Sequence, residues 1–350
     1  MRFLLYGAYG YTGKLMVKMA KDFGLTPVLA GRNEAKLKEV ADEAGYEYIV
    51  LDLTDTAKLE DTLQDFTVVL HAAGPFKFTA KPMMDACLKT KTHYLDITGE
   101  IAVFELGASK DENAQSAGIM VMPGVGFDVV PTDCTAAYLK NKMPDAVDLK
   151  LAFAPMGGGV SHGTALTMAE GLGEPSARRI DGEIIAVPLG EHAMTVPFMG
   201  KDIFVMSIPW GDVSTAYHTT GIPNIETFTR ANPKTHKGLK YQKYFGWILR
   251  SNFVKDRMRK KIKSRPAGPS DERRASGRMV IWGQATNAAG EQTIARLTTP
   301  EGYTLTAFMG LNITKKVLEG NFKPGFQTPA GCYGADLVFE MDGVTRDDGE

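Results

Sequence analysis

The sequence predicts an α/β protein in which a doubly wound parallel sheet is followed by a second, α+β domain with a mostly antiparallel sheet. Three observations lead to this prediction. A glycine-rich turn follows the first apolar run, and short apolar runs alternate with helical patterns through the first 135 residues. Beyond them, apolar and polar residues alternate with a period of two. Strands separated by helices are typical of parallel sheets, whereas period-two segments with few intervening helices are typical of antiparallel ones.

Six apolar runs in the first half are predicted strands, and the segments between them have helical patterns. The predicted strands cover residues 2–6, 27–30, 48–51, 67–71, 92–96 and 119–122. The predicted helices cover residues 13–23, 34–44, 57–63, 82–89 and 105–117, with another from about Thr132. Because a helix crosses back between successive strands, the strands point the same way and form a parallel sheet.

The second half alternates differently, and it sets the expected domain boundaries. Its predicted strands are 147–153, 184–188, 203–208, 215–219, 279–284 and 291–298, and its predicted helices are 164–172 and 304–318. We expect a nucleotide-binding domain over residues 1–135 and a substrate or dimerisation domain over 136–303, which contains a basic, partly helical insertion at 224–277. The segment 304–350 is expected to return to the first domain.

The stretch GAYGYTG directly follows the first predicted strand and opens the first predicted helix. Its three glycines lack a Cβ where a backbone approaches a pyrophosphate, and the helix N-terminus offers N–H groups and partial positive charge to the anion. A strand before and a helix after the glycines is the context that supports a dinucleotide-binding turn. The cofactor-binding residues predicted here are Gly7, Tyr9, Gly10, Tyr11, Thr12 and Gly13.

Residues after the second strand indicate which dinucleotide binds. An NAD site usually has an acidic residue there, whereas this chain has Gly31 and then Arg32, whose guanidinium matches the 2′-phosphate of NADP(H). Asp52, after the third strand, is predicted to accept a hydrogen bond from the adenine, or alternatively to form a turn or helix cap. The small residues Ala73, Gly74 and Pro75 follow the fourth strand and would let the backbone approach the cofactor.

Further motifs extend the comparison beyond a generic fold. They are GAYGYTGKL, LAGRNEAKL, HAAGPF, THYLDITGE, GFDVVPTD, GPSDERRASGRMVIWG, TPEGYTLTA and GFQTPAGCYGADLV. In order and spacing this set resembles the saccharopine dehydrogenase-like oxidoreductases, which include the mycobacterial trans-acting enoyl reductases, over nearly the whole chain. The resemblance implies an NADP-binding Rossmann domain, an α/β substrate domain and a homodimer. The substrate half lacks an evident set of arginines for several carboxylates, which argues against saccharopine itself.

Hydride transfer also needs a group that polarises or protonates the substrate. Tyr94 and Asp96 share one face of the fifth strand near its carboxyl end, with Glu100 just beyond. Asp128 follows the sixth strand, and His162 begins the predicted helix of the second domain. We predict Tyr94, Asp96, Asp128 and His162 as the catalytic candidates. The alternative is that Tyr94 packs in the core, Asp96 caps a turn and His162 faces solvent.

These residues predict an NADP(H)-dependent oxidoreductase that reduces a C=C, C=O or C=N bond of a small or lipid-like (acyl) substrate. One alternative is a non-catalytic NADP(H)-binding sensor or a membrane-associated scaffold. The other is an atypical short-chain reductase, because Tyr138 and Lys142 have the Y-x-x-x-K spacing of that class. No serine stands at the usual distance upstream of this pair.

Charge distribution narrows the expected partners. The net charge is −1, which argues against a surface built for nucleic acid. Residues 234–265 differ, with 12 Lys+Arg and one acid among interleaved aromatic residues, which suits an anionic membrane surface or an acidic partner such as an acyl carrier protein. The alternative is a surface helix that covers the second domain. Three scattered cysteines and no run of 18 apolar residues predict a cytoplasmic protein with no metal, signal peptide or membrane span.

Overall fold

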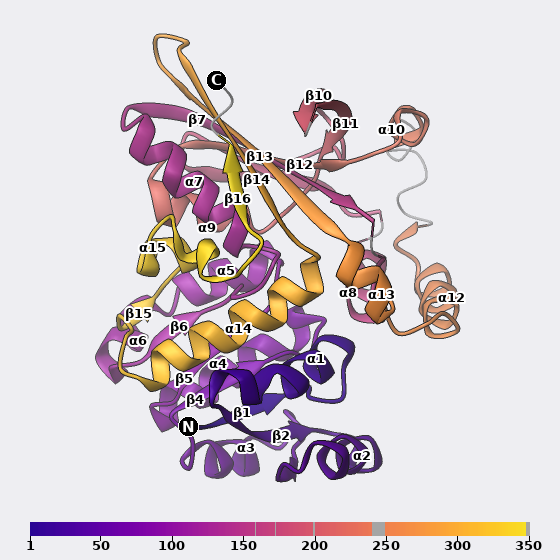
Figure 1. Ribbon diagram of the computed structural model, residues 1–350, viewed down its shortest axis with the longest axis vertical. Helices are drawn as coiled ribbons and strands as arrows, with labels where there is room; N and C mark the ends of the chain where they lie inside the picture. The colour runs from indigo at the N-terminus through magenta and orange to yellow at the C-terminus, as the bar shows by residue number, and fades with distance from the viewer. Residues whose placement is uncertain (158, 172, 199, 240–248, 348–350) are drawn as a thin grey trace. The chain divides into compact units, whose positions relative to one another are not determined.

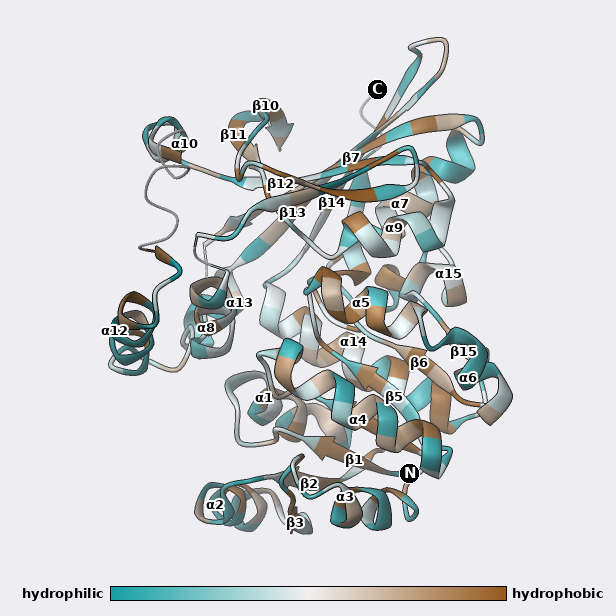
Figure 2. Cartoon of the chain, turned by 180° about the vertical axis from the view of Figure 1, so that it is seen from behind, coloured by the Kyte–Doolittle hydropathy of each residue, from teal (hydrophilic) through white to brown (hydrophobic). Residues whose placement is uncertain are grey.

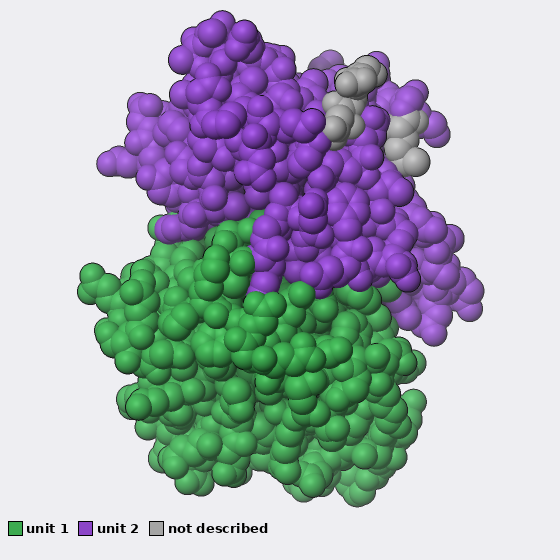
Figure 3. All heavy atoms as spheres, turned by 60° about the vertical axis from the view of Figure 1, so that its left-hand side comes forward, with its two compact units in different colours: residues 1–130, 303–332 green, residues 131–302, 333–350 purple. Residues whose placement is uncertain are grey.

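The chain folds into two compact units in the computed structural model, which describes residues 1–157, 159–171, 173–198, 200–239 and 249–347 (Figures 1 and 3). The first unit consists of Met1–Val130 and Tyr303–Cys332, and the second of Pro131–Gly302 and Tyr333–Glu350. The segment 304–350, which we expected to return whole to the first domain, is therefore divided. Its last strand, β16 (Thr345–Asp347), pairs with the sheet of the second unit.

The first unit contains a seven-stranded parallel sheet in the order β15-β6-β5-β4-β1-β2-β3. Strand β1 pairs with β2 on one side and with β4 on the other, so the strand order reverses between β1 and β4. This is the predicted doubly wound arrangement, in which ligands bind at the carboxyl ends of the strands beside the reversal. The strands are β1 Arg2–Tyr6, β2 Thr26–Gly31, β3 Tyr48–Val50, β4 Val68–His71, β5 His93–Asp96, β6 Met120–Met122 and β15 Gly325–Phe326.

The central strands of this sheet are covered on both faces. Phe3, Leu4 and Leu5 in β1 and Val69 and Leu70 in β4 have no exposed surface. A strand buried on both faces needs apolar residues at every position, which explains the continuous apolar runs in the sequence. The helices of this unit are α1 Tyr11–Met19, the 3₁₀ helix η1 Ala20–Phe23, α2 Glu34–Ala44, α3 Thr56–Leu63, α4 Phe76–Thr90, α5 Ile101–Ala108, α6 Asp111–Ala117 and α14 Gly302–Leu318.

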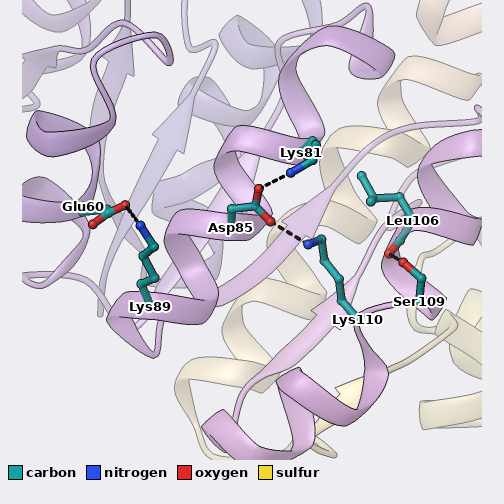
Figure 4. A network of polar contacts seen from close by, with 7 residues as sticks. All are labelled: Glu60, Lys81, Asp85, Lys89, Leu106, Ser109 and Lys110. Atoms are coloured by element: carbon teal, nitrogen blue, oxygen red, sulfur yellow. Dashed lines mark hydrogen bonds and ion pairs between the residues drawn. The ribbon is translucent and has the colours of Figure 1, made fainter.

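Two helix predictions in the first unit are wrong in extent. Helix α4 begins six residues before Pro82, the expected start, because the Glu100 side chain accepts hydrogen bonds from the backbone of its first turn. The single helix expected over 105–117 is two helices, α5 and α6. At the break between them the hydroxyl of Ser109 donates to the Leu106 carbonyl, and the ammonium of Lys110 reaches Asp85 on α4 at 2.6 Å (Figure 4).

The second unit contains a mixed sheet in the order β10-β11-β12-β7-β13-β14-β16, with β8 and β9 joined to it through β12. Among its described strands, only β12 and β7 pair in parallel, so the prediction of a mostly antiparallel sheet is confirmed. The strands are β7 Ala146–Met156, β8 Ser176–Ile180, β9 Glu183–Val187, β10 Ala193–Phe198, β11 Lys201–Ser207, β12 Asn224–Arg230, β13 Arg278–Asn287 and β14 Gln292–Pro300. Its helices include α7 Val130–Lys142, α8 His162–Glu170, α9 Asp212–Thr220, α10 Pro233–Leu239, α12 Asn252–Lys263 and α13 Asp271–Ser276.

Two predictions in the second unit are corrected. The strand expected over 215–219 is part of helix α9, which ends at Gly221 with a φ of 68°. Its β-branched residues favour a strand, but the glycine provides the left-handed C-terminal cap of a helix, and burial of Val213 and Ala216 stabilises it. The basic insertion does not begin at Asn224, because residues 224–230 form β12 inside the sheet, and the helical part begins at Pro233.

Candidate active site at the carboxyl edge of the first sheet

The turn after β1 brings the backbone close to the end of β4. Gly7 has a φ of 91°, and a Cβ at this position would lie 2.8 Å from the carbonyl carbon of Ala72 and 2.9 Å from the Cβ of Ala73. Both the positive φ and the lack of space require glycine here. The first predicted binding turn and the predicted Ala73–Pro75 segment are therefore in direct contact.

The other two glycines of the turn position helix α1. A Cβ on Gly13 would collide with the carbonyl oxygen of Gly7 and lie 2.9 Å from Ala8, so this glycine allows the helix to pack directly on the turn. Gly10 precedes the first residue of α1 and donates to the Gly7 carbonyl at 2.9 Å. No side chain caps this helix and its first turn has no acidic residue. Its N-terminus therefore suits an anion such as a pyrophosphate.

The predicted adenosine side of the site lies at the end of β2. The ring of Tyr9 lies so close to Gly31 that a Cβ there would be 2.6 Å from it, which brings the turn next to this strand. Arg32 is exposed beside it. Asp52 accepts hydrogen bonds from the backbone and hydroxyl of Thr54 at 2.9 and 2.8 Å, and these bonds, aided by the charge of Arg32, lower the pKa of its carboxyl. Asp52 therefore forms a turn in this structure.

His71, which we did not predict, ends β4 directly before this segment. It has no exposed surface, and its ring lies edge-on to those of Tyr6 and Phe76, with centroids 5.2 Å apart in both pairs. Burial lowers the pKa of its imidazole to about 3, so the ring is neutral at physiological pH. The apolar run that contains His71 gives no sign of a functional residue. Its aromatic surroundings indicate packing beneath the Ala72–Pro75 segment.

Glu100, just beyond β5, caps helix α4. Its two carboxylate oxygens accept hydrogen bonds from the backbone N–H groups of Phe76 and Lys77, each at 2.8 Å. A negative charge at this position is stabilised by the helix N-terminus. Glu100 lies 23 and 24 residues from its partners, so local sequence rules for helix caps do not find this contact. It joins the segments that follow β4 and β5.

Tyr94 and Asp96 on β5 have no exposed surface and contact each other. The hydroxyl of Tyr94 donates to one carboxylate oxygen of Asp96 at 2.5 Å, and the other oxygen accepts from the backbone of Thr98 and Gly124, each at 2.9 Å. Burial raises the pKa of the Asp96 carboxyl to about 7, although these hydrogen bonds act in the opposite direction. Asp96 thus connects the loops after β5 and β6.

Asp128 lies on the loop after β6, against the loop that carries Glu100. A Cβ on Gly99 would lie 2.9 Å from a carboxylate oxygen of Asp128, so the missing side chain makes room for this carboxyl. Asp128 is half-buried. Burial, followed by the negative charge of Glu100, raises the pKa of its carboxyl from 3.8 to about 7. A carboxylic acid in this range can donate a proton near neutral pH.

The remaining predicted candidates belong to the second unit. His162 begins α8, and its Nε2 lies 2.7 Å from the carbonyl oxygen of Arg265. Tyr138 lies on α7 with Lys142, whose ammonium is 5.5 Å above the centre of the tyrosine ring, and the guanidinium of Arg346 lies 3.9 Å from the same ring. Both cations therefore contact the ring of Tyr138. Within the described ranges, no group of three His, Cys, Asp or Glu side chains is placed to hold a metal ion.

Comparison with known proteins supports this description. Residues 3–122 match the model of the saccharopine dehydrogenase NADP binding domain. A saccharopine dehydrogenase-like oxidoreductase from Bos taurus is 26% identical over 246 residues, which cover 58% of this chain and 57% of the relative. The trans-acting enoyl reductase from Mycobacterium ulcerans (strain Agy99) is 30% identical over 147 residues, which cover 40% of this chain and 35% of the relative. Apo saccharopine dehydrogenase (L-Glu forming) from Saccharomyces cerevisiae has a TM-score of 0.68 at 14% identity and full coverage of both chains.

The fold and the glycine turn define the first unit as a dinucleotide-binding domain of the doubly wound class. More specifically, residues 3–122 match the NADP-binding domain of the saccharopine dehydrogenase family, and 58% of the chain aligns with a saccharopine dehydrogenase-like oxidoreductase. The predicted resemblance and the predicted cofactor, NADP(H), are confirmed. The chain spans less than three-fifths of the length of the curated relatives described here. Among the described residues, no helix is long and apolar enough to cross a membrane.

Proposed function

We propose that this protein is an NADP(H)-dependent oxidoreductase that reduces a C=C, C=O or C=N bond of a small or lipid-like (acyl) substrate. The observation that carries the proposal is the Asp128 carboxyl, which is half-buried, has a pKa raised to about 7 and lies beside Gly99 at the edge that also carries the glycine turn. The bound dinucleotide would supply the hydride. The protein must then supply position and a proton.

Asp128 is the proposed proton donor, and Glu100 maintains its acid form. Two backbone hydrogen bonds from α4 hold the Glu100 carboxylate in place, and its negative charge adds to burial in raising the pKa of Asp128. Asp96 is a positioning residue, since its carboxylate holds the loops that carry these two acids, and Tyr94 fixes Asp96. His162 stays a prediction as a second acid.

A lipid-like substrate is supported by one exposed side chain near this edge. Phe78, in the first turn of α4, is 62% exposed, two residues after Phe76, whose N–H binds Glu100. We propose that this exposed ring packs against the apolar chain of the substrate. The name of the mycobacterial relative, an enoyl reductase, points to the same substrate class. The homodimer and the cytoplasmic location stay predictions.

The test is NADPH oxidation across a panel of enoyl, keto and imino compounds that carry short or long acyl chains. We expect turnover for at least one class, with longer chains preferred. Tight NADPH binding with no turnover across the panel would favour the sensor alternative instead. Loss of turnover in Tyr138→Phe would favour the short-chain reductase alternative, because we expect that variant to keep full activity.

A further inference from the structure

A second surface of the protein lies on helices α8 and α12 of the second unit. The two helices pack against each other (Figure 1). The guanidinium of Arg259 on α12 pairs with the Glu170 carboxylate on α8, and the ammonium of Lys255 donates to the Glu170 carbonyl at 3.0 Å. The pairing fixes which face of α12 turns inward.

The inward face of α12 is apolar, and the outward face is aromatic and basic. Val254, Met258 and Ile262 recur every four residues and are partly or fully buried. On the neighbouring, outward face, Phe253 is 75% exposed, and Arg257, Lys260 and Lys261 follow it four, seven and eight residues later, so all four share one helix face. The colouring of Figure 2 shows both kinds of residue on this helix. We call these four side chains the α12 face.

The charge of the α12 face is not neutralised by neighbours. Helix α12 has six Lys and Arg residues and one acid, Asp256, which pairs with Arg259 at 2.7 Å. In the part of the chain that the structure describes, Arg257, Lys260 and Lys261 pair with no acidic side chain. Three lysines and arginines on one exposed face create a local positive potential even though the net charge of the chain is −1.

Exposed apolar side chains accompany this charge. Six large hydrophobic residues are exposed among those described, and three of them lie on these helices or just before α8: Val160 at 55%, Met168 at 62% and Phe253 at 75%. Apolar residues next to unpaired cations are typical of segments that lie in a membrane interface, where rings enter the acyl boundary and cations meet lipid phosphates. The aromatic residues Tyr241, Tyr244, Phe245 and Trp247 of the predicted basic segment lie outside the described residues.

We infer that the α12 face docks on the surface of an anionic lipid bilayer. Its charge and its exposed ring match a surface that offers many phosphates above an apolar layer. The cations have no fixed partners and sit on flexible stems, which suits attraction to mobile headgroups better than a bidentate contact with one acidic protein. This inference goes beyond the proposed function and does not depend on it.

The test is sedimentation of the full chain with vesicles of phosphatidylcholine, with or without phosphatidylserine. We expect binding only with phosphatidylserine, and weaker binding at high salt. K260E/K261E should lower the affinity by at least about tenfold, because each basic residue near the surface contributes to binding. Phe253→Ser should lower it by about fivefold through loss of the buried ring.

The matched control is K18E/K58E, which changes the net charge equally on exposed positions of the first unit. It should keep most of the affinity, since vesicle binding requires the α12 face and not net charge alone. Equal losses of vesicle affinity in both double variants would overturn the inference. No vesicle binding at low salt would also overturn it, and so would binding to an acidic carrier protein or a nucleic acid in the absence of vesicle binding. NADPH affinity and melting temperature, measured on each variant, separate these outcomes from misfolding and from failure of the proposed function.

Discussion

The two sheets differ in where they place the ends of their strands. In the first unit every strand pair is parallel, so the segments that follow β1, β4, β5 and β6 meet at one edge. In the second unit most neighbours are antiparallel, so strand ends alternate between two edges. A parallel sheet therefore collects chemical groups from distant parts of the chain at one edge, whereas the second sheet does not. Four variants test this division.

The largest expected effect on NADPH affinity comes from the substitution Gly7→Ala. The new methyl group would meet Ala72 and Ala73 at a residue whose φ is 91°, so the turn must move. We expect NADPH affinity to fall by at least about a hundredfold if, as predicted, the backbone of this turn binds the pyrophosphate. Fluorescence titration with NADPH measures it.

Gly24→Ala is the matched control for this variant. Its φ is 67°, but a Cβ there would meet no atom within 4 Å. It should be destabilised only by the backbone strain, by about 1 kcal/mol, with unchanged NADPH affinity. Equal affinity in the two variants would refute the role of the turn.

Asp128→Asn should lower turnover by about a hundredfold or more, with little change in NADPH affinity, because only the proton donor is lost. In the native protein, reductive turnover should fall as pH rises above about 7, because the Asp128 carboxyl loses its proton. A pH–rate profile measures it, and the asparagine variant should lack this decline. A profile unchanged by the substitution would remove Asp128 from the mechanism.

The raised pKa of Asp128 also determines how the folding stability of the protein changes with pH. The folded state holds this proton more tightly than the unfolded state does, so the contribution of Asp128 to stability is present at low pH and is lost as pH rises from about 4 to about 7. The stability of Asp128→Asn relative to that of the native protein should therefore be greater at pH 8 than at pH 4. Urea unfolding at the two pH values measures this.

Arg32→Ala should weaken NADPH binding by about tenfold and leave NADH binding unchanged, because only NADPH has the phosphate that the guanidinium would contact. Competition titrations with both cofactors measure the ratio. Arg2→Ala, another exposed arginine at the amino end of β1, is the control and should affect neither cofactor. Equal weakening of both cofactors by Arg32→Ala would contradict a role in selectivity.

The smallest expected effect on the cofactor comes from Gly283→Ala in the second sheet. Its Cβ would lie 2.7 Å from side-chain carbons of both Leu139 and Thr135, so we expect a loss of about 1–3 kcal/mol in the free energy of unfolding. NADPH affinity should change less than about twofold, because the crowding is confined to the second unit. Gly238→Ala, where a Cβ meets nothing within 4 Å, should cause no such loss.

All three tryptophans of the chain, at 210, 247 and 282, belong to the second unit, so tryptophan fluorescence during denaturation reports on that unit. A large loss of NADPH affinity in Gly283→Ala would show that the two units do not act separately.

Local sequence patterns predicted the first sheet well and the second less well. Continuous apolar runs and the glycine turn identify β1, β2, β4 and β5, because strands buried on both faces leave a strong signal. In the second unit, the β-branched residues of 215–219 favour a strand in isolation, and tertiary packing makes them helical. Most strands there are half-exposed, so their patterns are weaker.

The candidate site was predicted only in part. Asp96 and Asp128 were proposed because Asp96 ends one predicted strand and Asp128 follows another, and the topology brings both to one edge. The contact of Glu100 with α4 was not predicted, because its partners lie more than 20 residues away and no local rule connects them. His71 was missed because a histidine within an apolar run is indistinguishable from a core residue.

The sequence by itself determined the glycine turn, the doubly wound topology and the choice of NADP(H), since each depends on residue types at short spacing. Only the tertiary structure decided how the surroundings of the three carboxyl groups differ. Asp96 is fixed by three hydrogen bonds, Glu100 accepts two from a helix N-terminus, and Asp128 lies beside Gly99. Burial raises the pKa of both Asp96 and Asp128 to about 7. Their differences arise from burial and from neighbours distant in the chain, which set the protonation of a carboxyl group more strongly than its local sequence does.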